Sequence, residues 1–197
     1  TDFFTTGTYD ARREFYKTNA PAMDILVSSN LERLVWFMVN GDSEKVNKYM
    51  EELKETGVYK VDDETLARVQ KEFKAGCLGE EDVLKVVHDC WNENKYLLDT
   101  HTAVGYGVYE EYVKNTGDTT KTILLSTASP YKFPESVYQA LTGEEVDVYT
   151  AIEKLHDLTG MEISYPLKGI KDREILHKGV IDKDAILDTI AEKIKEY

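Results

Sequence analysis

The sequence predicts an α/β fold, and two short strand-to-helix units carry that prediction. The first begins with the apolar segment DILV at residues 24–27 and leads through two serines into a helical pattern at 30–39. The second begins with the apolar run at 123–125 and leads through the polar turn STASP to a helix start at Pro134. Open α/β sheets bind small molecules at the carboxyl ends of their strands, where such turns hold hydroxyls and backbone N–H groups.

The rest of the chain is predicted to be mostly helical. Residues 1–22 are polar and aromatic, which indicates turns and irregular chain with room for one short helix. After them, apolar residues recur at helical spacing, and glycines end most segments. The predicted helices are 30–39, 42–56, 62–73, 80–94, 99–116, 135–141, 145–158 and 182–195, with an extended segment at 165–167. The three helices within 42–95 have little strand between them, which predicts a helical insertion or subdomain there.

Composition excludes several classes of protein. The 197 residues carry a net charge of −13 with no basic run, so nothing neutralises a nucleic-acid backbone. No apolar run is long enough to cross a membrane, and no signal peptide opens the chain.

Cys77 and Cys90 lack a CxxC pattern and indicate reduced, buried residues of a cytoplasmic protein, with a disulfide as the alternative. His88, His156 and His177 have no partners at metal-ligand spacing, so we expect no metal site.

Ser126 and Thr127 lie in the turn after the second predicted strand. Their hydroxyls either hold a ligand at the sheet edge or cap the next helix. Lys132 follows them, but nothing nearby in the sequence supplies the desolvation that would lower its pKa for Schiff-base chemistry. We therefore expect Lys132 to face an anion or solvent.

Two other stretches place polar side chains at helix starts. His101 and Thr102 either point into a site where the positive helix end attracts an anion, or follow Asp99 as an ordinary N-cap. Asn30 and Arg33 share a helix face. They either bind a phosphate or carboxylate, with Arg33 as a bidentate partner, or belong to a capped surface helix.

These stretches occur in an order that resembles the carboxyl-terminal portion of threonine synthase, a pyridoxal-phosphate enzyme of the tryptophan-synthase-β-like fold type II. The matching text covers about the first 140 residues: TDFFTTGTYD, PAMDILVSSNLER, DTHTAV, TGDTTKTILLSTASPYKF and SVYQAL. DTHTAV departs from the family's more usual DPHTAV, with Thr100 where Pro is common. Thr is tolerated at that position, so the departure raises no doubt about function.

The resemblance implies part of the large domain of a fold-type-II enzyme, an open sheet flanked by helices. The family is a carbon–oxygen lyase of threonine biosynthesis that converts O-phospho-L-homoserine and water into L-threonine and phosphate, using pyridoxal 5'-phosphate. It implies that Thr127, beside Ser126, faces the pyridine nitrogen of the cofactor. It also implies a place in the substrate cleft for five further residues: Asn30, Arg33, His101, Thr102 and Lys132. Arg33 or Lys132 is the expected partner of the substrate's phosphate.

The family places its Schiff-base lysine and its glycine-rich phosphate loop upstream of the segment that begins at Thr1. Neither is present here, and the chain starts without Met, so we expect a piece of a longer protein that carries no catalytic residue and is inactive alone. Its expected partners are the substrate and the upstream part of the same enzyme. An unpaired sheet edge also predicts self-association. Two alternatives stay open: a non-catalytic binding module for a phosphorylated amino acid, and an enzyme of the same fold with another phosphorylated substrate.

Overall fold

The computed structural model describes residues 1–196, which fall into two compact units. The first unit comprises Thr1–Ile163 and the second Ser164–Tyr197, of which Tyr197 lies outside the described residues. Both predicted site turns and all seven predicted site residues belong to the first unit.

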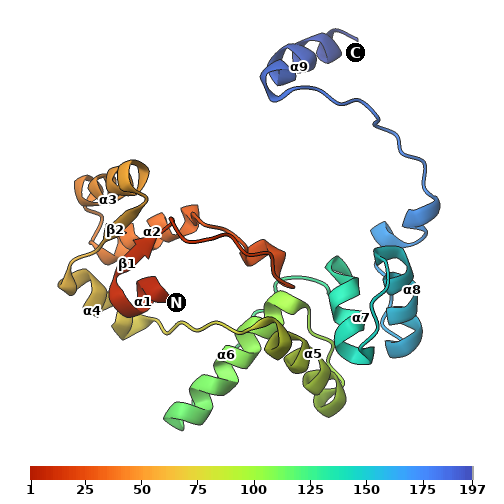
Figure 1. The fold of residues 1–197 in the computed structure, drawn as a ribbon, viewed down its shortest axis with the longest axis horizontal. Helices are drawn as coiled ribbons and strands as arrows, with labels where there is room; N and C mark the ends of the chain where they lie inside the picture. The colour runs from red at the N-terminus through yellow and green to blue at the C-terminus, as the bar shows by residue number, and fades with distance from the viewer. Residues whose placement is uncertain (197) are drawn as a thin grey trace. The chain divides into compact units, whose positions relative to one another are not determined.

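The first unit opens with a small group of helices around a two-stranded sheet (Figure 1). The chain runs in the order α1 (Asp2–Thr6), β1 (Thr8–Asp10), α2 (Ser29–Met38), α3 (Ser43–Thr56), β2 (Val58–Lys60) and α4 (Asp63–Glu72), with a short 3₁₀ turn at Pro21–Met23. The two strands are antiparallel, and Tyr9 lies opposite Tyr59.

The core of this group is aromatic at its centre and aliphatic around it. The Tyr59 ring stacks between Tyr9 and Tyr49, with ring centroids 5.5 Å apart on each side. Phe3 packs edge-on against Tyr9 and at a tilt against Tyr59. Valines from α2, α3 and α4 complete the cluster: Val35, Val46 and Val69. Burial of these side chains is the main stabilising contribution in this part of the chain.

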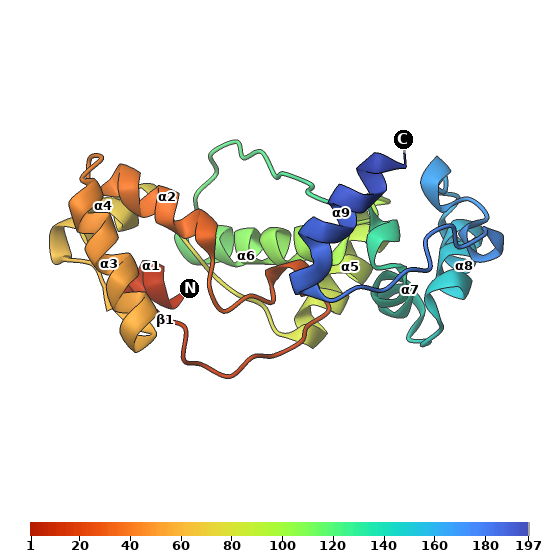
Figure 2. The same ribbon diagram turned by 90° about the horizontal axis from the view of Figure 1, so that it is seen from above.

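The rest of the first unit is helical. It contains α5 (Glu80–Asn94), α6 (Thr100–Thr116), α7 (Pro134–Thr142) and α8 (Val148–Thr159), with a 3₁₀ turn at Pro130–Lys132. The α5 helix packs against both α6 and α7, and α7 packs against α8. Residues 117–129 leave the end of α6 as an open loop and return to α7 (Figure 2). This loop carries the STASP turn.

The second unit holds the 3₁₀ turns Tyr165–Leu167, Ile170–Asp172 and Lys183–Ala185, followed by α9 (Ile186–Lys195). The apolar positions of α9 lie on one face and are exposed: Ile186, Leu187, Ile190 and Ile194. Within residues 1–196, no helix has the length and apolar character needed to cross a membrane.

The structure confirms the eight predicted helices, with shifts of up to four residues at their ends. The α7 helix begins at Pro134, and a short 3₁₀ turn precedes α9. Asp42, Asp62 and Asp99 cap their helices through side-chain oxygens. Gly57 and Gly117 end their helices with positive φ angles of 78° and 68°, a conformation that favours glycine.

Three extended segments were predicted wrongly. Residues 24–27 form a bend because Tyr9 takes the backbone bonds that a strand would use: its Oη donates to the Leu26 carbonyl at 2.9 Å and accepts from Ser28 N–H at 2.7 Å. Residues 123–125 lie in the open loop, with no strand beside them among residues 1–196. Residues 165–167 form a 3₁₀ turn. A strand needs a partner for its backbone groups, and the described residues supply none at these places.

The two thiols are free. Cys90 is buried, as predicted, but Cys77 is exposed, so the prediction of burial was wrong at that position. Gly76 next to it is held against α6, since a Cβ there would lie 2.7 Å from a Val108 methyl, which leaves Cys77 pointing to solvent.

Candidate functional site

Asp99 is the centre of the largest group of predicted site residues. It is the N-cap of α6 and is only 1% exposed. Its Oδ1 accepts from His101 N–H at 2.9 Å and from Thr102 N–H at 3.3 Å, and its Oδ2 accepts from the Thr102 hydroxyl. The negative carboxylate at the positive end of a 17-residue helix is electrostatically favourable, which offsets part of the cost of burying it.

His101 connects this cap to the chain before α2. Its Nδ1 lies 3.2 Å from Asp99 Oδ1, and its Nε2 accepts from Ala22 N–H at 3.0 Å. Because Nε2 accepts a hydrogen bond, the neutral ring carries its proton on Nδ1 and donates it to Asp99. The ring centroid lies 5.1 Å from that of Phe133. Both nitrogens of His101 are therefore engaged inside the chain.

Thr127 is held at the same place by its backbone. Its N–H donates to Thr102 Oγ1 at 3.3 Å, across 25 residues of sequence. The Thr127 side chain is exposed, and its hydroxyl makes no hydrogen bond within residues 1–196. Ser126 is exposed beside it. A fixed backbone with a free hydroxyl is the arrangement expected of a ligand-facing residue.

Lys132 reaches the same group through Phe133. Its Nζ lies 5.4 Å from the centroid of the Phe133 ring, and the same ring packs against His101. Lys132 is exposed at the end of the 3₁₀ turn that precedes α7. Four predicted residues, His101, Thr102, Thr127 and Lys132, thus form one connected set around Asp99.

Asn30 and Arg33 form a separate pair on the exposed face of α2. Arg33 Nη2 donates to Asn30 Oδ1, as their spacing of three residues allows. Arg33 also lines a pocket of about 280 Å³ with Glu32, Trp36, Phe37 and Val46. The segment that leads into α2 is fixed by Tyr9 through Leu26 and Ser28. No hydrogen bond or ring contact among residues 1–196 joins this pair to the group around Asp99.

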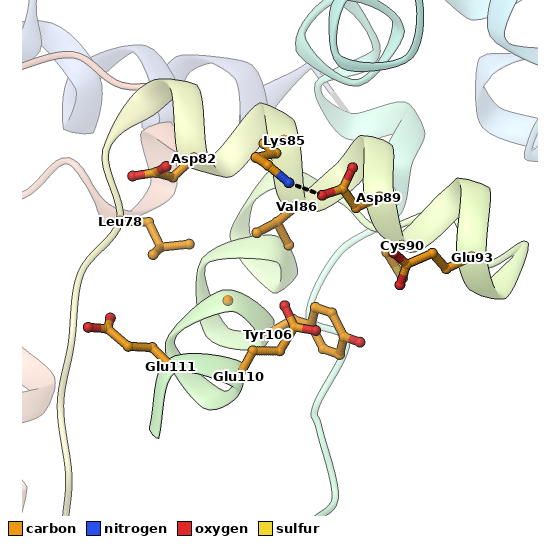
Figure 3. A pocket seen from close by; sticks show the side chains of 11 residues that line it. Leu78, Asp82, Lys85, Val86, Asp89, Cys90, Glu93, Tyr106, Glu110 and Glu111 are labelled. Carbon is orange, nitrogen blue, oxygen red and sulfur yellow. Dashed lines mark hydrogen bonds and ion pairs between the residues drawn. The ribbon is translucent and has the colours of Figure 1, made fainter. Parts of the chain in front are cut away.

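The larger pocket, of about 350 Å³, lies between α5 and α6 and contains none of the predicted residues (Figure 3). Carboxylates dominate its lining: Asp82, Asp89, Glu93, Glu110 and Glu111. Its one lysine, Lys85, is paired with Asp89, and that hydrogen bond raises the pKa of Lys85. Burial raises the pKa of Tyr106 on the same wall. A wall of this charge repels phosphate, so it does not fit the ligand that the sequence suggests.

No cluster of three or more His, Cys, Asp or Glu side chains within residues 1–196 is arranged to hold a metal ion. Three features of this group were not predicted from the sequence: the contacts of Asp99 beyond its role as a cap, the Ala22 N–H that His101 accepts, and the position of Phe133 between His101 and Lys132. The signal for Asp99 was present: an Asp followed three residues later by Thr allows one carboxylate to bind both backbone and hydroxyl. Ala22 and Phe133 carried no local signal, since only the tertiary structure brings them to His101.

Comparison with known proteins gives a consistent result. Residues 102–169 match the family model described as "Threonine synthase, C-terminal". Threonine synthase of Saccharomyces cerevisiae is 36% identical over 155 residues, which cover 72% of this chain and 30% of the yeast protein. Human "Threonine synthase-like 1" is 31% identical over 169 residues, covering 80% of this chain and 22% of that protein. The match to a crystal structure of yeast threonine synthase covers 99% of this chain and 40% of the yeast chain, with a TM-score of 0.80 and 29% identity.

The chain belongs to the threonine synthase family. It corresponds to a carboxyl-terminal portion of these proteins and spans less than half the length of the relatives it matches. A second solved family member, described as PLP-bound threonine synthase from Brucella melitensis, matches 86% of this chain with a TM-score of 0.64 and 29% identity. The predicted fold class is confirmed at this level: the chain has the fold of part of an α/β fold-type-II enzyme of the threonine synthase family, although its own sheet has two short strands.

Proposed function

We propose that this chain forms the carboxyl-terminal part of the active site of a pyridoxal-phosphate-dependent threonine synthase. The reaction is that of a carbon–oxygen lyase, with O-phospho-L-homoserine and water as substrates and L-threonine and phosphate as products. One observation carries the proposal: the Thr127 hydroxyl is exposed and unbonded within residues 1–196, while Thr102 holds its backbone N–H. The cytoplasmic location stays a prediction.

The residues present fit the cofactor's ring. A pyridine nitrogen needs one hydrogen-bonding group in its plane, and Thr127 offers a neutral hydroxyl on a fixed backbone, with Ser126 next to it. A hydroxyl holds a proton on the ring nitrogen less strongly than a carboxylate does. When bound, pyridoxal phosphate supplies the electron withdrawal that lets protons leave the α and β carbons of the substrate.

Arg33 and Lys132 are the proposed partners of the substrate's phosphate. A doubly charged leaving group needs cationic neutralisation as its bond to carbon breaks. The Lys132 ammonium has no acidic partner within residues 1–196 and faces the Phe133 ring. Arg33 uses one guanidinium nitrogen on Asn30, which leaves further N–H donors for phosphate oxygens. His101 and Thr102 have their side-chain nitrogens and oxygen bonded within the chain, so we assign them to shaping the cleft.

The experiment compares this chain alone with the same chain joined to the residues that precede it in a longer protein. The joined protein is expected to release phosphate from O-phospho-L-homoserine, and the 197-residue chain is expected to release none. Thr127→Val in the joined protein should lower kcat by about 100-fold if the hydroxyl tunes the ring, since single positioned groups contribute about 10²–10³. Arg33→Gln and Lys132→Gln should mainly raise the KM for phosphohomoserine.

A cofactor titration tests whether any lysine of this chain anchors the cofactor. The chain alone, treated with pyridoxal phosphate and reduced with borohydride, is expected to show no single lysine adduct on peptide mapping. A stoichiometric adduct on Lys132 would mean that this segment anchors the cofactor by itself. The upstream location of the anchor lysine would then be wrong.

A second candidate is a family member that binds a phosphorylated amino acid without completing the reaction. The chain is 36% identical to yeast threonine synthase and 31% and 30% identical to human "Threonine synthase-like 1" and "Threonine synthase-like 2", so similarity alone does not separate the two candidates. The joined protein would then bind phosphohomoserine but release no phosphate. Calorimetric binding together with a phosphate-release assay separates the two candidates.

A further inference from the structure

Two helices of the first unit start with the same arrangement of residues. In α6 the pattern is Asp99-x-x-Thr102, and in α8 it is Asp147-x-x-Thr150. In both, Oδ1 of the aspartate accepts two backbone N–H bonds, at 2.9 and 3.3 Å in α6 and at 3.1 and 3.2 Å in α8. In both, Oδ2 accepts the proton of the threonine hydroxyl. As helix caps the two arrangements are equivalent.

They differ in burial. Asp99 is 1% exposed and Thr102 is 3% exposed, whereas Asp147 lies on the surface. Removing a carboxylate from water is costly, and an exposed aspartate caps a helix equally well, as Asp147 does. Capping alone therefore does not account for a buried carboxylate at the start of α6.

Thr102 and His101, which both bind Asp99, also accept hydrogen bonds from two other segments of the chain. Thr102 Oγ1 accepts the Thr127 N–H at 3.3 Å, and His101 Nε2 accepts the Ala22 N–H at 3.0 Å. Ala22 lies in the 3₁₀ turn Pro21–Met23, and Thr127 lies in the open loop before α7. One carboxylate is thus two hydrogen bonds away from two irregular segments that are more than 100 residues apart.

Because the Asp99 carboxylate can only accept hydrogen bonds, it decides which atoms donate and which accept in both series of hydrogen bonds. Thr102 has a single hydroxyl proton, and giving it to Asp99 leaves oxygen lone pairs for the Thr127 N–H. The neutral His101 ring also has a single N–H proton, and directing it from Nδ1 to Asp99 leaves Nε2 as an acceptor for Ala22. An amide in place of the carboxylate would put an N–H₂ donor against one of these groups.

We propose that Asp99 is a positioning residue that fixes the backbones of Thr127 and Ala22 through Thr102 and His101. This inference rests on the proposed function for what is being positioned, namely the Thr127 hydroxyl that faces the cofactor ring. The hydrogen-bond order itself is a property of this chain and is measured without cofactor or activity.

The test uses the ¹⁵N-labelled 197-residue chain and the matched variants Asp99→Asn and Asp147→Asn. Asparagine is nearly as good an N-cap as aspartate, so far-UV circular dichroism should be unchanged in both. In Asp99→Asn, amide exchange at Thr127 and Ala22 should accelerate by about threefold to tenfold, the range that the net contribution of one hydrogen bond gives. In Asp147→Asn both rates should equal those of the unaltered chain. The ring-nitrogen shifts of His101 should report an Nδ1–H tautomer that is lost only in Asp99→Asn.

Two substitutions at Thr102 keep the proposal testable if Asp99→Asn fails to fold. Thr102→Val should accelerate exchange at Thr127 and leave Ala22 unchanged, because it breaks one path only. Thr102→Ser restores the hydroxyl and should restore the slow rate. Unchanged Thr127 exchange in both Asp99→Asn and Thr102→Val would overturn the proposal. An equal acceleration in Asp147→Asn would overturn it as well, since it would indicate general destabilisation.

A cofactor experiment on the joined protein separates this proposal from the proposed function. Adding pyridoxal phosphate is expected to shift the Thr127 resonance. If the resonance does not move while the contrast between Asp99→Asn and Asp147→Asn persists, the proposed function fails and the positioning role of Asp99 stands. If the resonance moves but Asp99→Asn and Asp147→Asn behave alike, the proposed function stands and the positioning role of Asp99 fails.

Discussion

Thr100 is the first residue of α6 and lies between the cap Asp99 and His101. It is fully buried, and its hydroxyl is the single buried side-chain polar atom within residues 1–196 that lacks a hydrogen-bond partner. The first helical position has no intrahelical use for its N–H, so proline fits there. Asp99 already has the extended backbone, φ −77° and ψ 161°, that a residue before proline adopts.

Thr100→Pro is therefore expected to stabilise the chain by about 1 kcal/mol, through a stiffer unfolded state and removal of the unpaired hydroxyl. Urea unfolding monitored by circular dichroism measures the change. Thr100→Val removes the hydroxyl without the ring and should give a smaller gain. A loss of stability in both variants would mean that the Thr100 hydroxyl has a partner that stabilises the folded chain.

Asp62 connects α3, α4 and the aromatic core by accepting hydrogen bonds from Lys45 Nζ, from Thr65 N–H at 2.9 Å and from Tyr49 Oη at 3.0 Å. The Lys45 bond first, and then the Thr65 N–H, hold the pKa of Asp62 well below its usual range. The pKa is lower folded than unfolded, so this stabilisation is fully present above about pH 4 and is lost as the pH falls further.

Asp62→Asn keeps the helix cap and removes the charge. Its stability deficit against the unaltered chain should be greatest near pH 7 and should shrink between about pH 4 and pH 2, where the aspartate becomes protonated. Urea midpoints at pH 7, 4 and 3 measure it. Asp42→Asn is the control, because Asp42 caps α3 through a single backbone bond to Lys45 N–H. A deficit that does not change with pH would contradict the assignment.

At the level of single residues, local rules predicted the starts and ends of helices. The caps and the glycine ends of helices followed from residue type alone, because each satisfies backbone groups close by in sequence. Asp99, Thr102 and His101 were all recognised as a helix start. Their second role could not be predicted, since Ala22 and Thr127 are brought to them by the tertiary structure.

At the level of elements, α6 shows how closely the helices pack. Two of its glycines face different surroundings. A Cβ on Gly107 would lie 2.5 Å from a Leu78 methyl and 3.0 Å from a Val86 methyl, beside the pocket between α5 and α6. A Cβ on Gly105 would meet nothing closer than a Leu124 methyl at 3.8 Å.

Gly105→Ala is expected to stabilise the chain by about 0.5–1 kcal/mol, the usual gain of alanine in a helix. Gly107→Ala should lose that gain and destabilise by about 1 kcal/mol, because Leu78 and Val86 must shift. Gly105 and Gly107 are two residues apart on the same helix, so each variant serves as the control of the other in urea unfolding. Equal stabilisation by both would show that α5 and α6 are more loosely packed than these distances imply.

The predicted strands were wrong because a strand, unlike a helix, depends on a second segment. A helix satisfies its own backbone, so periodicity and caps predict it from a single segment. A strand depends on another segment for its backbone bonds, and the apolar runs at 24–27 and 123–125 find none among residues 1–196. The helical insertion at 42–95 stays a prediction.

At the level of the whole molecule, the two apolar runs that were predicted as strands lie at the surface. Ile123 is 84% exposed and Leu125 is 75% exposed, and Ile25 and Val27 are about half exposed. The chain spans 40% of the yeast structure that matches 99% of it. Exposed apolar runs with unpaired backbone are the usual starting points of edge-to-edge association.

The isolated chain is therefore expected to self-associate, and replacing Ile123 and Leu125 together by lysine should reduce that association. Sedimentation velocity over a concentration series measures the association.

Lysine is chosen because its charge and the loss of apolar surface have opposite effects on association. Two lysines bring the net charge from −13 toward neutrality, which on its own favours association. A fall in association must then come from the lost apolar surface. Thr119→Lys with Thr120→Lys adds the same charge to the same exposed loop and should not reduce association. Equal behaviour of the two double variants would assign the association to another surface, of which the exposed face of α9 is the next to test.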